Sequence, residues 1–131
     1  MARIVLEPTR RVPTRVAIPR FGEAVAPCFE YSATITIFTV RGSQVIDQTD
    51  FRLKSREPVD RVRLLRDQQV QTLICGGVQE RFEYLVGACG IRVISWVSGN
   101  VDELLGLYLQ GRLVPGTAPL SGPPTQPFDD G

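Results

Sequence analysis

The residues best suited to chemistry in this chain are two cysteines that lie far apart in the sequence. Cys75 belongs to the run Leu73-Ile74-Cys75-Gly76-Gly77, an apolar segment that ends in two glycines, and Cys28 lies in the sequence Pro27-Cys28-Phe29. In an open α/β sheet, ligands bind beyond the carboxyl ends of the strands, and glycines let backbone approach a ligand closely. We therefore predict that two cysteine-bearing loops meet at a binding site.

The chain has 131 residues, three cysteines and no histidine. The absence of histidine removes the imidazole base that serine and cysteine nucleophiles use, and it removes the zinc sites that contain histidine. Three thiols are too few for a closed structural site of four cysteines. Widely spaced cysteines in an odd number fit a reducing compartment better than a disulfide framework. We therefore expect free thiols in a cytoplasmic protein.

The composition and net charge of the chain indicate which kinds of partner to expect. Hydrophobic residues make up 43% of the chain and charged residues 22%, which is typical of a globular domain. The net charge of +1 gives no electrostatic reason to expect nucleic acid as a partner. No stretch approaches the roughly 20 apolar residues that cross a bilayer. We expect neither a nucleic acid nor a membrane as partner.

Five runs rich in β-branched and aromatic residues predict strands at residues 15–19, 33–40, 44–51, 72–75 and 91–96. Apolar residues at helical spacing predict helices over residues 58–68, 79–89 and 101–110, the last capped by Asn100. A hairpin followed by right-handed crossovers predicts an α/β fold, with a mixed five-stranded sheet in the order 3-2-1-4-5 flanked by helices.

The two ends of the chain differ in composition from the part that carries these elements. We predict that residues 1–14 are an extension with a short strand at 3–6, and that residues 15–114 form the domain. Residues 115–131, rich in proline and glycine, offer little apolar surface to bury. We predict a flexible tail there.

Each candidate site residue has a structural alternative. Cys28 could reach a ligand as a thiolate or fill space beneath its loop, and Cys75 could contact a ligand or simply pack at the end of a buried strand. Arg20 could face an anion or only solvent. Cys89 lies on the apolar stripe of its predicted helix, which favours a structural role. Trp96 could wall the site, although a large aromatic residue at a strand end more often belongs to the core.

With these elements placed, the chain resembles the dinitrogenase iron–molybdenum cofactor biosynthesis family, which includes NifX-like proteins and the carboxyl-terminal domain of NifB proteins. The resemblance runs from about residue 15 to residue 114. It is carried by Arg15-Val16-Ala17-Ile18-Pro19, Val25-Ala26-Pro27-Cys28-Phe29, Thr72-Leu73-Ile74-Cys75-Gly76-Gly77, Gly90-Ile91-Arg92-Val93, Val97-Ser98-Gly99 and Tyr108-Leu109-Gln110-Gly111-Arg112-Leu113.

The resemblance implies a ribonuclease H-like fold and a non-catalytic carrier or chaperone of metal–sulfur clusters in nitrogen fixation. The cargo would be an iron–molybdenum cofactor precursor or an iron–sulfur cluster, and a cluster-assembly or acceptor protein would be the partner. The implied cofactor-binding residues are Cys28, Phe29, Cys75, Gly76, Gly77 and Arg20, with Cys28 and Cys75 as metal ligands.

One departure from the family bears on that function. The family pattern Pro-His-Phe-Gly is replaced here by Pro27-Cys28-Phe29-Glu30. Thiolate is softer than imidazole and suits iron–sulfur clusters, Cu(I) or zinc, so binding is either retained with a changed preference or lost in a protein-interaction or regulatory module. A nuclease is the least favoured alternative, because two-metal hydrolysis needs several carboxylates and the first predicted strand has none.

Overall fold

The computed structural model describes residues 12–119. The sheet has the strand order β4-β3-β1-β5-β6, with β2 paired to β1 beside this path. The strands are β1 (Thr14–Phe21), β2 (Ala24–Val25), β3 (Thr34–Arg41), β4 (Gln44–Arg52), β5 (Thr72–Ile74) and β6 (Arg92–Ile94). Numbered over the five predicted strands alone, the path reads 3-2-1-4-5. The prediction of five strands was wrong by one, because the two residues of β2 are too short for a periodic signal.

The sheet is mixed. Strand β1 pairs antiparallel with β3, and β3 with β4, whereas β1, β5 and β6 run parallel to one another. The parallel half needs crossover connections, and helices α1 (Val59–Asp67) and α2 (Glu80–Ala88) supply them. The last helix, α3 (Val101–Leu109), follows β6.

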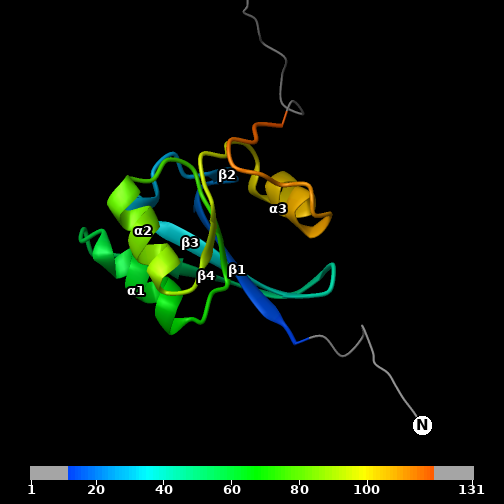
Figure 1. Ribbon diagram of the computed structural model, residues 1–131, viewed down its shortest axis with the longest axis horizontal. Helices are drawn as coiled ribbons and strands as arrows, with labels where there is room; N and C mark the ends of the chain where they lie inside the picture. The colour runs from blue at the N-terminus through cyan, green and yellow to red at the C-terminus, as the bar shows by residue number, and fades with distance from the viewer. Residues whose placement is uncertain (1–11, 120–131) are drawn as a thin grey trace, which may run out of the picture.

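Helices cover both faces of the sheet, with α1 and α2 on one side and α3 on the other (Figure 1). Because successive side chains of a strand point to opposite faces, β1 contributes to two cores. Ala17 packs in the core beneath α1 and α2, whereas Val16 and Ile18 pack in the core beneath α3. A strand buried on both faces explains why its sequence is continuously apolar rather than alternating.

Local sequence signals set the ends of the helices. The side chain of Asn100 caps α3 as predicted, its Oδ1 accepting a hydrogen bond from the backbone N–H of Glu103 at 3.1 Å. Helix α2 ends before Gly90, whose φ of 81° is the left-handed conformation typical of a helix C-terminus.

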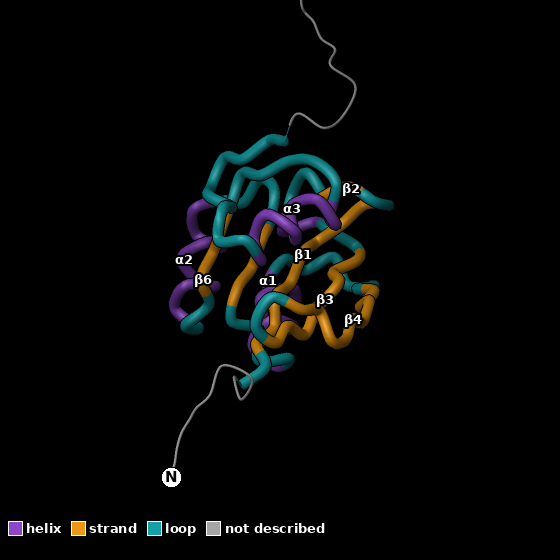
Figure 2. Tube along the Cα trace, turned by 90° about the vertical axis from the view of Figure 1, so that its right-hand side faces the viewer, coloured by secondary structure: helices purple, strands orange, loops and turns teal. Residues whose placement is uncertain are grey.

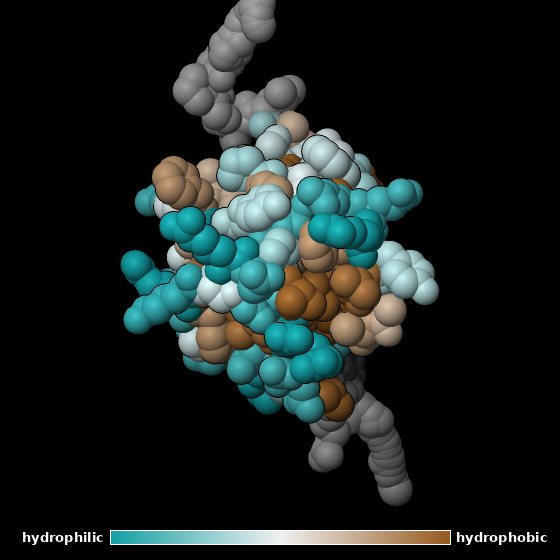
Figure 3. Space-filling view, turned by 90° about the vertical axis from the view of Figure 1, so that its left-hand side faces the viewer, coloured by the Kyte–Doolittle hydropathy of each residue, from teal (hydrophilic) through white to brown (hydrophobic). Residues whose placement is uncertain are grey.

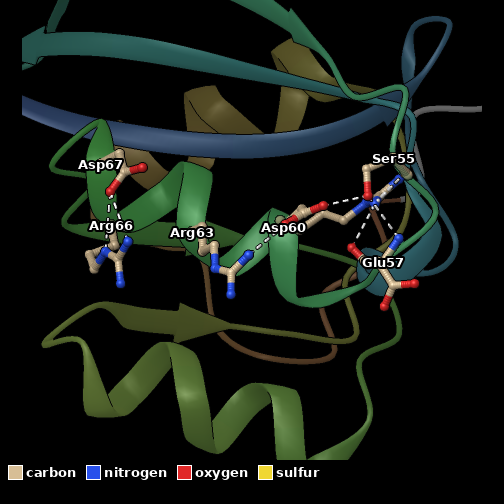
Figure 4. Close-up of polar contacts among 7 residues, drawn as sticks. Ser55, Glu57, Asp60, Arg63, Arg66 and Asp67 are labelled. Carbon is tan, nitrogen blue, oxygen red and sulfur yellow. Dashed lines mark hydrogen bonds and ion pairs between the residues drawn. The ribbon is translucent and has the colours of Figure 1, made fainter.

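Polar contacts hold the segment before α1 (Figure 4). The guanidinium of Arg61 is buried and donates to the carbonyl oxygens of Ser32, Ser55 and Glu57 at 2.8–3.0 Å. Asp60 pairs with Arg63 and accepts a hydrogen bond from Ser55. The exposed ion pairs of α1 contribute only about 0–1 kcal/mol each, so the buried Arg61 is the main polar anchor.

The face that carries α1 and α2 is mostly hydrophilic at its surface, with one larger apolar patch and smaller apolar areas around it (Figure 3). None of the helices between residues 12 and 119 is long and apolar enough to cross a membrane.

Two predictions concern the ends of the chain, which the structure describes only in part. The strand expected at residues 3–6 and residues 120–131 of the expected tail lie outside the described residues. The first part of that tail, residues 115–119, bonds back to the domain. Gly116 donates its backbone N–H to Ser95, and Thr117 accepts at its carbonyl from Ser98, both at 3.0 Å.

Candidate functional site

Three loops meet at the carboxyl ends of the parallel strands, at the upper end of the sheet in Figure 2. They follow β1, β5 and β6. Residues Cys28 and Gly77 form an isolated parallel bridge, in which Gly77 donates to the carbonyl of Pro27 and accepts from the N–H of Phe29, both at 2.8 Å. The prediction that the two cysteine-bearing loops lie side by side is confirmed.

The loop after β1 is fixed along its whole length. Strand β2 turns it back so that Ala26 donates to the carbonyl of Pro19, and Val25 donates to the carbonyl of Gly99 in the loop after β6, both at 2.9 Å. At its far end, the buried guanidinium of Arg61 donates to the carbonyl of Ser32 at 3.0 Å. A loop held at both ends can present one side chain in a defined position.

Crowding by neighbouring backbone explains the paired glycines. A Cβ added at Gly76 would lie 2.5 Å from the carbonyl oxygen of Ala26. A Cβ added at Gly77 would lie 3.0 Å from the carbonyl oxygen of Pro27 and 3.2 Å from the ring of Trp96. The glycines therefore let the chain pack against itself, and their contact with a ligand stays a prediction.

Cys75 is the less accessible of the two thiols at this edge. Its side chain is fully buried, and its backbone groups bond to Ile94, the last residue of β6, and to Val97 in the loop that follows. Burial raises the pKa of the Cys75 thiol to about 12, with smaller contributions from the charges of Glu83, Glu30 and Cys28. Metals bind the thiolate, so the environment of Cys75 disfavours the role of metal ligand predicted for it.

Cys28 is partly exposed and lines an open pocket of about 600 Å³. Arg20 lines the same pocket, so the structure brings together two of the predicted site residues. The Nε of Arg20 donates to the carbonyl of Gly22 at 2.8 Å, which fixes the guanidinium at the pocket wall. Most of the wall is apolar, and Phe21 and Tyr31 line it although 81% and 64% of these residues are exposed.

Phe29 is predicted to bind the cofactor, and its side chain is buried in the structure. It is fully buried in the core beneath α1 and α2, together with Cys75. Its ring belongs to that core and has no exposed surface. The contact of Phe29 with a ligand stays a prediction.

Glu30 is a buried acid that sequence reasoning did not assign to the site. One carboxylate oxygen accepts from the backbone N–H of Gln79 at 3.2 Å, just before α2, and the other has no hydrogen-bond partner in the described chain. A carboxylate at a helix N-terminus is favourable because the helix dipole is positive there. The sequence does mark Glu30 as unusual, because the family pattern has a glycine at this position. That substitution does not reveal that the side chain is buried.

Trp96 lies beside the same turn and was expected to belong to the core more often than to the site. Instead 63% of it is exposed. Its ring packs against the turn at Gly77. Cys89, which was expected to fill the core, is also exposed, at the end of α2. Between residues 12 and 119, no three histidine, cysteine, aspartate or glutamate side chains gather as a metal-binding group.

Solved structures share this fold. A protein of Thermotoga described as a candidate NifB protein of the DUF35 family has 25% identity and a TM-score of 0.60, with 83% of this chain and 99% of that chain covered. A candidate dinitrogenase of Methanocaldococcus jannaschii has 18% identity and a TM-score of 0.64, with coverage of 79% and 94%. The apo form of the orange protein of Desulfovibrio gigas has 18% identity and a TM-score of 0.63, with coverage of 86% and 97%.

The chain has the fold of the dinitrogenase cofactor biosynthesis family. The identities are low, so what is similar is the architecture. No family model matches the chain, and no curated protein matches it in sequence. The resemblance in sequence motifs and the likeness in structure therefore point to the same family by separate routes.

Proposed function

We propose that this protein is a small non-catalytic carrier of a metal–sulfur cluster, either an iron–molybdenum cofactor precursor or an iron–sulfur cluster. The observation that carries the proposal is the position of Cys28. It is a partly exposed thiol in a fixed loop at the carboxyl edge of the parallel strands, at the position of the family's histidine. The fold of the candidate NifB protein and of the orange protein, which was solved in an apo form, supports the proposal.

The chemistry of the site suits a cargo that must be released. A thiolate at Cys28 is a soft ligand for iron or copper, and a single protein ligand leaves the cluster's other positions to its own sulfide or to an acceptor. Arg20 shares the pocket and supplies positive charge for an anionic cluster. In this proposal the fold is ribonuclease H-like, the protein works in the cytoplasm, and its partner is a cluster-assembly or acceptor protein of nitrogen fixation.

The test is anaerobic assembly of an iron–sulfur cluster on the purified protein from ferrous iron and sulfide. Wild type should hold iron and sulfide in stoichiometric amounts, and Cys28→Ser should hold at least about tenfold less. Cys89→Ser is the matched control, since Cys89 is an exposed thiol outside the site. Equal binding by all three proteins would remove Cys28 from the site, and no binding by wild type would end the carrier proposal.

A protein-interaction module is the second candidate, and the exposed aromatics favour it. Phe21 and Tyr31 keep 81% and 64% of their surface exposed beside an apolar pocket. Aromatic side chains are enriched at protein interfaces. Under this alternative, Phe21→Ala weakens binding to the partner protein while Cys28→Ser does not. A nuclease has less support, because β1 contains no acidic residue.

A further inference from the structure

Trp96 is held in a backbone conformation that few large residues adopt. Its φ is 61°, the left-handed region that costs little for glycine and of order 1–3 kcal/mol for a bulky residue. It is also the only tryptophan of the chain. Residues in this region concentrate at binding and active sites, where the surrounding structure holds them in place.

The exposure of Trp96 is a second feature that does not favour the stability of the fold. At 63% exposed, the indole gains little of the hydrophobic stabilisation that a buried tryptophan gives. Its backbone N–H donates to the carbonyl of Gly76 at 2.9 Å, which fixes the residue at the edge of the glycine turn. Packing in the core therefore does not explain why a tryptophan stands at this position.

The ring of Trp96 lies next to the cysteine loop. Two of its atoms lie 3.2 and 3.3 Å from the point where Gly77 would carry a Cβ. Cys28 and Gly77 are bridge partners, and the Cβ directions of paired residues lie on the same face of a sheet. The indole and the side chain of Cys28 thus lie on the same side of the Cys28–Gly77 bridge. The residues that line the pocket shared by Cys28 and Arg20 do not include Trp96, so the indole lies beside that pocket and not within its wall.

We propose that Trp96 contacts the cargo bound to Cys28 and forms its second wall. This inference rests on the carrier function proposed above. A metal–sulfur cluster exposes sulfur atoms, and the positive edge of an aromatic ring makes favourable contacts with sulfur. The ring also keeps water from one side of a cluster that has only one protein ligand. On this account the indole is exposed because its partner surface arrives with the cargo.

The inference predicts opposite effects on cargo retention and on stability. The experiment loads wild type and variants anaerobically with ferrous iron and sulfide and measures how fast an iron chelator removes the iron. Trp96→Gly and Trp96→Asn, which both tolerate a positive φ, should lose iron about three- to tenfold faster than wild type. The apo form of Trp96→Gly should melt at the same temperature as wild type or higher, because glycine relieves the backbone strain. If Trp96 had only a structural role, Trp96→Gly would melt at a lower temperature than wild type and would lose iron at the wild-type rate.

Two further variants complete the comparison. Trp96→Phe keeps an aromatic ring and should lose iron at a rate close to that of wild type. Tyr84→Ala, which removes an aromatic residue that is 74% exposed on α2, should also leave the rate unchanged. Wild-type retention in Trp96→Gly, or a Trp96→Phe rate equal to that of Trp96→Gly, would overturn the inference and leave the carrier function standing. A wild type that takes up no iron would overturn both.

Discussion

The turns that follow β5 and β6 lie side by side but are built in opposite ways. After β5, Cys75 is buried and the backbone of Gly76 and Gly77 is enclosed by the neighbouring loop. After β6, the chain places Trp96 at a positive φ and leaves it exposed. Packing alone explains the residues of the β5 turn. In the β6 turn, packing does not offset the backbone strain and the exposure of Trp96.

This difference suggests two roles for the two turns at this edge of the sheet, one structural and one in the proposed binding. The β5 turn is the supporting element, because it fixes the position of the Cys28 loop through the two bonds of Gly77. The β6 turn has the proposed binding role, because its exposed ring has room to contact the proposed cargo. Substitutions in the two turns should therefore differ in kind, with loss of stability in the first and loss of binding in the second.

The largest effect is expected for Gly76→Ala. The new Cβ would lie 2.5 Å from a backbone carbonyl oxygen of Ala26, which is part of a loop fixed on both sides and has little room to move. We expect a loss of about 3 kcal/mol in the free energy of unfolding, the upper end of overpacking costs. Urea denaturation of the apo protein measures it.

The control for this substitution is Gly87→Ala. Gly87 lies in α2, and a Cβ there would meet nothing within 4 Å, so alanine should stabilise the helix by about 0.5–1 kcal/mol. If Gly76→Ala were as stable as Gly87→Ala, the loop would yield easily, and the β5 turn would lose its role as the rigid support.

The sequence predicted much of this fold because most of its elements are periodic. The three helices appear within about two residues of the predicted bounds, and the Asn100 cap is where its side-chain chemistry placed it. The meeting of the Cys28 loop with the Gly76-Gly77 turn followed from the general rule that the carboxyl ends of parallel strands share one edge.

The exposure of individual residues could not be predicted in the same way. Phe29 begins a short 3-10 helix, Phe29–Tyr31, and Trp96 lies in a turn, and both are aromatic residues that follow a strand. One is fully buried and the other is mostly exposed. The difference arises because Phe29 enters the core beneath α1 and α2, whereas Trp96 sits in the irregular turn after β6. Such irregularities depend on contacts between loops distant in sequence, which a local pattern does not encode.

The second effect concerns the pH dependence of stability and comes from Cys75. The folded-state pKa of its thiol is raised from 9.0 to about 12 by burial. Between these values the unfolded chain has released the proton and the folded chain retains it, so stability falls as pH rises. The slope approaches about 1.4 kcal/mol per pH unit for one proton. Below pH 9 this contribution is constant.

Unfolding measured between pH 8 and 11 in wild type and Cys75→Ala isolates this contribution, since alanine has no proton to release. The difference in slope between the two proteins is the quantity of interest, because the cavity left by the substitution adds a pH-independent offset. If the free energy of unfolding of Cys75→Ala had the same pH dependence as that of wild type, the Cys75 thiol would ionise easily in the folded protein. Cys75 would then again be a candidate metal ligand.

The smallest effect is expected from shortening the carboxyl-terminal segment. Ending the chain at Val114 removes the bonds that Gly116 and Thr117 make with Ser95 and Ser98, on either side of Trp96. Two backbone hydrogen bonds contribute about 1–3 kcal/mol together. Ending it at Pro119 keeps both bonds. We expect the shorter protein to unfold at lower urea concentration than the one ending at Pro119.

The same pair of truncations tests whether the β6 turn depends on support from outside. The strained backbone of Trp96 needs neighbours that hold it, and residues 115–119 are the segment that bonds to its flanks. Without that segment the turn should relax, and the fluorescence emission of the single tryptophan should shift in the shorter protein only. Identical emission and identical stability in the two truncated proteins would mean that the β6 turn is held by the β5 turn alone, and that the two turns form one rigid unit.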